Sequence, residues 1–257
     1  SHNPIKENSK TKDIVIMFLL TIFMLCIPFY RGLFFRQNYI PAIILISIIF
    51  AVYIALKFKD KSYGLVSTYM DASVLMISAA FLISFFFAAN AKDALDMFLI
   101  YFSYFMLYKL TSDLSSRDEI YKNIFINVII ASTFILSFTS MLHLAGIINI
   151  KGSFVGNRLF GLYQYANTSA SVLGVGIILS LNTLMYADNI KKKVIYQMIL
   201  TALIPTFIFT LSRGGYLVLA AVLFVNFIFV GAKAKVKLIM GLVVSFLSSS
   251  VFIYKYY

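Results

Sequence analysis

The sequence has few of the residues from which disulfides and metal centres are built. Of its 257 residues, one is cysteine and two are histidine. The single Cys26 excludes an intrachain disulfide and any zinc or iron–sulfur site that needs several cysteine ligands. Neither a Walker-type phosphate loop nor a Gly-x-Gly-x-x-Gly motif occurs, so nothing indicates an ATP-driven motor. We therefore expect neither a metal nor a cofactor.

Charged residues are also scarce. They make up 12% of the chain, against 61% hydrophobic residues. A soluble domain must cover its core with polar groups, so this composition predicts an integral membrane protein. The apolar stretches are long enough for helices that cross a hydrocarbon core of about 30 Å, and they lack the alternation of a membrane β-barrel. We predict an all-α, polytopic bundle of transmembrane helices.

The apolar stretches divide into nine predicted spans. Pro28 lies near the end of the first span and Pro205 within the seventh, and at each the missing backbone donor predicts either a kink or ordinary packing. The nine spans are Ile14–Phe29, Tyr39–Leu56, Ala72–Ala89, Ala94–Leu110, Ile124–Ile148, Ser169–Ala187, Val194–Leu211, Gly215–Val230 and Leu238–Tyr254.

The basic residues predict the orientation of these spans. If the amino terminus is cytoplasmic, 15 of the 22 lysines and arginines fall on the cytoplasmic face, as the positive-inside rule requires. Residues 1–13 then form a cytoplasmic tail and residues 14–257 a single transmembrane domain. The formal charge of +12 does not indicate nucleic-acid binding, because the basic residues form short loop clusters without an aromatic-lined groove.

Two arginines are predicted to face the opposite, extracytoplasmic side. Arg158 lies in the loop between the fifth and sixth spans, and Arg213 lies in the turn between the seventh and eighth. Arginines on the translocated side oppose the insertion bias, so two that face one compartment suggest a site for an anionic, phosphorylated ligand. The alternative is that they reach lipid headgroups, as we expect for Arg31 and Arg36.

The neighbours of Arg213 favour an anion site. Ser212 offers a hydroxyl, and Gly214 and Gly215 permit a tight reversal with close approach of backbone N–H groups to a ligand. The eighth span begins here, so the amino terminus of its helix adds partial positive charge.

The loop after the fifth span contains a spaced set of residues. Arg158 is followed by Gly161 three residues later, by Asn167 nine residues later and by the small Ala170 twelve residues later. This spacing resembles the outer-loop motif of the O-antigen ligase and O-antigen polymerase family of bacterial envelope enzymes. The residue before the asparagine is often proline in that family, and here it is Ala166.

A second match lies at the turn after the seventh span. The family carries Ser-Arg-Gly at the head of its conserved membrane region, as in Ser212, Arg213 and Gly214. The resemblance implies a multi-span glycosyltransferase of the bacterial inner membrane that works on the outer face without a metal. Its donor would be a glycan linked to polyprenyl diphosphate. Its acceptor would be a hydroxyl on a lipid anchor, as in a ligase, or on a second lipid-linked repeat unit, as in a polymerase.

In this reading the arginines stabilise the negative charge that grows on the leaving diphosphate. The expected binding residues are Arg158, Arg213, Ser212, Gly214, Gly161 and Asn167. The attacking hydroxyl also needs a proton acceptor. His143, Asp93 and Asp96 lie near outer ends of spans but match no family motif. In the family the candidate histidine lies in a large outer loop further along. We therefore expect the base beyond residue 257 and the chain to be the amino-terminal part of a longer protein.

Several roles remain open from sequence. Asn167 either binds sugar or loop backbone or caps the sixth span. Tyr163, Tyr165 and Tyr216 either stack on sugar rings or are ordinary interfacial aromatics. The alternative function is a secondary transporter or flippase for an anionic or lipid-linked solute, which would place ionisable groups near the membrane midplane. The span interiors are nearly free of charge, which favours the enzyme.

Overall fold

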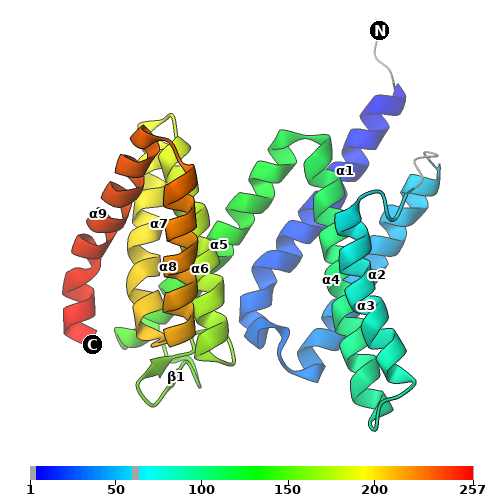
Figure 1. Cartoon of the computed structure of the whole chain (residues 1–257), viewed down its shortest axis with the longest axis horizontal. Coiled ribbons are helices and arrows are strands. Elements are labelled where there is room, and N and C mark those ends of the chain that lie inside the picture. The colour runs from blue at the N-terminus through cyan, green and yellow to red at the C-terminus, as the bar shows by residue number, and fades with distance from the viewer. Residues whose placement is uncertain (1–3, 60–63, 257) are drawn as a thin grey trace. The chain divides into compact units, whose positions relative to one another are not determined.

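The computed structural model describes residues 4–59 and 64–256, and within them the chain is helical apart from loops and one short hairpin (Figure 1). The prediction of an all-α chain is thereby confirmed. The elements are α1 (Pro4–Cys26), the 3-10 segment η1 (Ile27–Leu33), α2 (Arg36–Lys59), α3 (Tyr69–Phe85), α4 (Ala91–Arg117), α5 (Glu119–Leu144), β1 (Phe154–Val155), β2 (Arg158–Leu159), α6 (Ala166–Tyr186), α7 (Ile190–Phe209), α8 (Arg213–Phe229) and α9 (Ala232–Tyr256).

Many of these helices have the length and composition of membrane spans. Among the described residues, six are long and apolar enough to cross a membrane, and α3 and α8 are shorter apolar helices of 17 residues. Each predicted span overlaps one α-helix, and the first also overlaps η1. The largest differences are at α1, which begins at Pro4, and at α4, which continues to Arg117, because an apolar pattern marks only the apolar part of a helix. Pro28 lies in η1, after α1 has ended at Cys26, and non-helical residues follow it from Tyr30 to Gly32.

The chain divides into two compact units. Unit 1 contains the described residues within Ser1–Phe23 and Phe35–Phe125. In it α3 and α4 form an antiparallel pair and α2 packs against α4 (Figure 1). Its core contains Leu20, Ile46, Phe105, Leu110 and Leu114, each at most 2% exposed.

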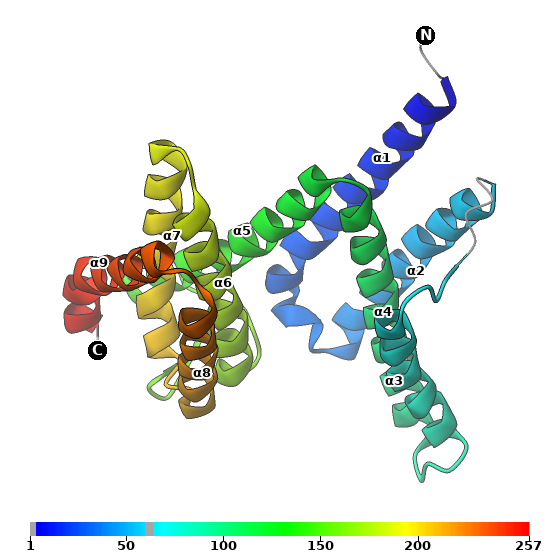
Figure 2. The ribbon, with the colours of Figure 1, turned by 45° about the horizontal axis from the view of Figure 1, so that its top comes forward.

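Unit 2 contains Met24–Phe34 and the described residues within Ile126–Tyr257. Helix α6 contacts α7, α8 and α9, and Figure 2 shows α9 inclined across α7. Close packing also joins α6 to α5, because a Cβ at Gly176 would lie 2.3 Å from Thr133 Oγ1. The core of the unit is built from Leu136, Leu173, Ile177, Leu181, Leu200 and Leu203.

A hairpin follows α5 at the end of unit 2 where α6 begins and α7 ends (Figure 1). Its strands pair Phe154 with Leu159 and Val155 with Arg158. Gly156, at the first of the two turn positions, has a φ of +59°, which is typical of a type II′ turn. Leu159 is fully buried and holds the hairpin against the helices. The strand thus presents Arg158 at the end of the helical unit.

Candidate functional site

Arg158 is held at the junction of three elements. Its Nε donates to the carbonyl oxygen of Thr210, at the end of α7, over 3.1 Å. One of its terminal nitrogens donates to Oδ1 of Asn167, in the first turn of α6, over 2.8 Å. A guanidinium has five N–H donors, so three remain without an acceptor among the described residues. Arg158 is thus fixed in direction while still able to bind a ligand.

The same Asn167 oxygen connects Arg158 to the second motif. Ser212 donates its hydroxyl to Asn167 Oδ1 over 3.1 Å, and its hydroxyl oxygen accepts the backbone N–H of Gly215. Ser212 is therefore the N-cap of α8, and Arg213 is its first residue. Two motifs more than forty residues apart in sequence meet through the Asn167 side chain.

Arg213 is exposed, and within the described part of the chain its side chain has no hydrogen bond or ion pair. Because Ser212 occupies the amide of Gly215, the first-turn amides of Arg213 and Gly214 remain available as donors. Gly214 is exposed, and a Cβ there would meet no atom within 4 Å. The start of α8 therefore offers a cation, free amides and open space together.

This end of unit 2 has no carboxylate to neutralise it. After Glu119 the printed sequence contains one acidic residue, Asp188, which lies between α6 and α7 at the opposite end of α6 from Asn167. Arg158 and Arg213 consequently have no acidic partner within their own unit. A pair of guanidiniums without an acidic partner in its own unit is an electrostatic match for an external anion.

The glycines of the two motifs shape the backbone. Gly161 has a φ of +62°, and a Cβ there would lie 2.8 Å from Ser140 Oγ on α5. It is buried, so it fixes the path of the loop and does not face a ligand. Gly215 lets α6 and α8 approach, because its Cβ would lie 2.8 Å from that of Ala170. The tight reversal expected at Gly214 and Gly215 is instead made by Leu211, with a φ of +49°.

Of the two roles left open for Asn167, the structure excludes the cap of α6. Tyr165 occupies the N-cap position without a side-chain hydrogen bond, and Asn167 lies inside the first turn. Its side-chain oxygen is instead used by Arg158 and Ser212, as described above. The residue therefore joins the two arginine motifs.

The three tyrosines differ in their availability to a ligand. Tyr163 is 6% exposed, and burial raises the pKa of its phenol to about 12, so it stays protonated near neutral pH. Tyr216 donates its hydroxyl to the carbonyl oxygen of Ile208 over 2.5 Å. Tyr165 is 51% exposed, so it is the most accessible of the three to a ligand.

The residues considered as proton acceptors are all engaged by nearby groups. His143 Nδ1 accepts the amide N–H of Ile150 over 3.1 Å. In unit 1, Asp96 accepts hydrogen bonds from Arg36 Nε and from the Tyr39 hydroxyl, both over 2.9 Å, while Asp93 pairs with Asn90.

Arg31 and Arg36, which we expect to reach lipid headgroups, also make contacts within the protein. Arg36 forms the salt bridge with Asp96. Arg31 donates to the carbonyl oxygen of Lys151, in the loop that leads to the hairpin. A sequence motif gives no sign of this second contact, because it joins residues 120 positions apart.

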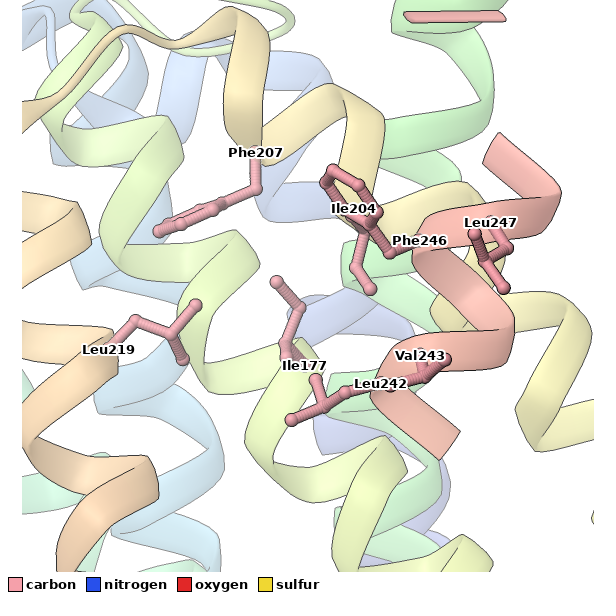
Figure 3. Close-up of a pocket in the computed structure, with 8 residues that line it drawn as sticks. All are labelled: Ile177, Ile204, Phe207, Leu219, Leu242, Val243, Phe246 and Leu247. Carbon is pink, nitrogen blue, oxygen red and sulfur yellow. The ribbon is translucent and has the colours of Figure 1, made fainter. Parts of the chain in front are cut away.

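An apolar cavity of about 390 Å³ lies between α6, α7, α8 and α9 (Figure 3). Phe207, in its wall, packs edge-on against Tyr216, with ring centroids 5.4 Å apart. Leu219, also in its wall, follows Arg213 on α8 by about 9 Å of helix rise. The cavity is completed by Ile177, Ile204, Leu242, Val243, Phe246 and Leu247.

Sequence reasoning missed a buried ion network in unit 1. Lys109 and Asp71, each 1% exposed, form a salt bridge of 2.9 Å between α4 and α3. Lys109 also contacts Asp113 over 3.0 Å, and Asp113 is bonded by Lys57 and by the Tyr53 hydroxyl of α2. The spacing of Lys109 and Asp113 on one helix face was a usable signal. The partnership with Asp71, 38 residues away, was not readable from sequence.

Comparison of the chain with protein-family models, with curated proteins and with solved structures finds no match to any of them.

Proposed function

We propose that the chain is a membrane glycosyltransferase of the O-antigen ligase or polymerase type, with nine spans, a cytoplasmic amino terminus and its reactive end on the outer face of a bacterial inner membrane. The observation that carries the proposal is the meeting of Arg158 and the Ser212–Gly214 turn through Asn167, at an end of unit 2 without carboxylates. The donor is a glycan on polyprenyl diphosphate, and the acceptor is a hydroxyl on a lipid or on a second glycan.

Each part of the site suits one part of such a donor. The diphosphate oxygens accept hydrogen bonds from the free N–H groups of Arg158, from the guanidinium of Arg213 and from the first amides of α8. The apolar cavity behind Tyr216 suits the first isoprenoid units of the lipid chain, because it is lined by aliphatic and phenylalanine side chains.

The reaction exchanges one bond to the anomeric carbon for another. The bond from this carbon to the diphosphate oxygen breaks, its electron pair remains on the diphosphate, and the acceptor oxygen bonds to the same carbon while its proton passes to a base. Fixed guanidiniums favour this step because they stabilise the charge that develops on the leaving group.

Transfer tests the proposal directly. Full-length protein purified in lipid, given a polyprenyl-diphosphate glycan and a lipid or glycan acceptor, is expected to form glycosidic product at the same rate with and without a metal chelator. Product formation is read by mass spectrometry of the lipid-linked glycan. Strict dependence on a divalent cation would contradict the metal-independent step.

The transporter alternative has one observation in its favour, the buried ion network of unit 1, since intramembrane charges often mark transport paths. Against it, the Lys109 ammonium is bonded to both Asp71 and Asp113, and Asp113 is also paired with Lys57. Uptake of an anionic solute into proteoliposomes without any change in glycan length would establish the transporter in place of the transferase.

The proposed orientation gives a labelling prediction. Single cysteines placed at Asn157 and Gly214 in a Cys26→Ser background are expected to react with a membrane-impermeant maleimide in intact cells, because both positions are exposed. A cysteine at Lys192, which is also exposed and lies at the opposite end of α7, is expected to react only after permeabilisation. Labelling of the Lys192 position in intact cells would reverse the orientation.

A further inference from the structure

The turn that follows α1 has an unusual backbone. Arg31, Gly32 and Leu33 have φ values of 56°, 65° and 59°, so three successive residues are left-handed and two of them are not glycine. Such conformations are costly for residues with a Cβ and persist when the surroundings impose them. We refer to residues Arg31–Phe34 as the 31–34 turn, which belongs to unit 2.

The 31–34 turn is held in this conformation by the loop between α5 and α6. A Cβ built on Gly32 would lie 2.2 Å and 2.4 Å from two ring carbons of Tyr163. The backbone of the turn therefore lies directly on the aromatic ring, and no side chain fits between them. Tyr163 is itself buried, so its ring has little freedom to move away.

Two further contacts hold the same loop on either side of the hairpin. Before the hairpin, the Arg31 guanidinium donates to the Lys151 carbonyl oxygen. After the hairpin, the Phe34 ring packs edge-on against Tyr165, with centroids 5.2 Å apart. The turn thus contacts the loop at residues 151, 163 and 165, which flank the strand that carries Arg158.

We propose that the 31–34 turn positions Arg158 for the diphosphate, with Gly32 and Arg31 as the positioning residues. Neither touches the ligand. They fix the base of the hairpin, so that Arg158 keeps its bonds to Thr210 and Asn167 and leaves its other N–H groups for the diphosphate. The inference rests on the proposed function, because it assigns to Arg158 the role of a diphosphate ligand.

The test compares two glycine substitutions in the purified protein. Gly32→Ala adds a Cβ at a left-handed position and forces it into Tyr163, whereas Gly146→Ala adds a Cβ at a position with a φ of +74° and open space around it. Farnesyl diphosphate is the probe, with affinity measured by calorimetry. Gly32→Ala is expected to weaken binding roughly tenfold to a hundredfold, because a displacement of about 1 Å is enough to lose a charge-assisted contact. Gly146→Ala is expected to leave the affinity unchanged.

Double variants distinguish an effect of Gly32 on Arg158 alone from a general disturbance of the site. If Gly32 acts through Arg158, adding Gly32→Ala to Arg158→Ala is expected to cause little further loss of affinity, while adding it to Arg213→Ala still weakens binding. Equal losses in both backgrounds would overturn the proposal, as would equal effects of Gly32→Ala and Gly146→Ala. Arg31→Ala, which removes a contact without crowding, is expected to shift affinity in the same direction as Gly32→Ala.

Hydrogen exchange tests the positioning without any ligand. The amides of Phe160 and Gly161 donate to the Ser153 carbonyl oxygen at the base of the hairpin. Gly32→Ala and Arg31→Ala are expected to speed exchange at these two amides and to leave α7 and α9 unchanged. Normal exchange in both variants would contradict the positioning role. If wild-type protein showed no affinity for farnesyl diphosphate, the proposed function would fail, and the exchange rates would still decide whether the turn orders the hairpin.

Discussion

Replacing Lys109 by methionine is expected to destabilise unit 1 by about 3–5 kcal/mol. The ammonium of Lys109 lies between the carboxylates of Asp71 and Asp113, with N···O distances of 2.9 Å and 3.0 Å. Its removal leaves two carboxylates close together, and that of Asp71 is almost fully buried. Breaking one partner of a buried pair is costly because the remaining charge is desolvated without compensation. The free energy of unfolding in mixed detergent micelles measures the effect.

The chain contains a matched control for this change. Lys122 forms a salt bridge of 2.6 Å with Glu119, and both side chains are at least half exposed. Lys122→Met is expected to change the stability by less than about 1 kcal/mol, because water and salt screen such pairs. Adding Asp71→Asn to Lys109→Met is expected to recover part of the lost stability. Equal, small effects of the two lysine substitutions would show that the buried network does not stabilise unit 1.

Replacing Arg213 by alanine is expected to lower both transfer and affinity for prenyl diphosphate by roughly tenfold to a hundredfold. This tenfold to hundredfold loss corresponds to about 1.5–3 kcal/mol for one charged hydrogen bond. Arg213→Lys is expected to restore little of the loss, because an ammonium lacks the planar fork that holds two phosphate oxygens at once. Arg213 has no partner among the described residues, so its loss is expected to leave the fold unchanged.

Lys151 provides the control for simple removal of a positive charge. It lies in the loop that leads to the hairpin, and its side chain is exposed. Lys151→Ala keeps the backbone carbonyl that Arg31 binds and is expected to change affinity little. Equal losses of affinity for Lys151→Ala and Arg213→Ala, at equal protein abundance, would mean that Arg213 contributes only to the overall positive potential of the surface.

Sequence patterns predicted the helical class well and the helix ends less well. Long apolar runs located all the helices of the described residues, because hydrocarbon permits few alternatives to a helix with internal hydrogen bonds. Helix α1 extends well before its apolar part, and η1 replaces the end of the first span. Hydropathy identifies only the apolar part of a helix. The helix itself continues for as long as its backbone hydrogen bonds are formed, so its ends can lie outside the apolar stretch.

The candidate site was only partly readable from sequence. The spacing from Arg158 to Asn167 and the Ser212–Gly214 turn were visible as motifs, but their connection through one amide oxygen was not. Asparagine is common at caps, which made Asn167 a candidate for the cap of α6, but the N-cap is Tyr165, two residues earlier. The contact between Gly32 and Tyr163 and the pairing of Lys109 with Asp71 depend on tertiary packing, which no local pattern encodes.

The central claim is that Arg158 and Arg213 together bind the diphosphate of a lipid-linked donor. Calorimetric titration of the wild-type protein and the Arg158→Ala and Arg213→Ala variants with farnesyl diphosphate, and with farnesol as the uncharged comparison, tests it most directly. The account predicts tight binding of the diphosphate to wild type, losses of roughly tenfold or more in each variant, and weak, equal binding of farnesol to all three. Equal affinity of the three proteins for farnesyl diphosphate, or equal affinity of wild type for the diphosphate and the alcohol, would contradict it.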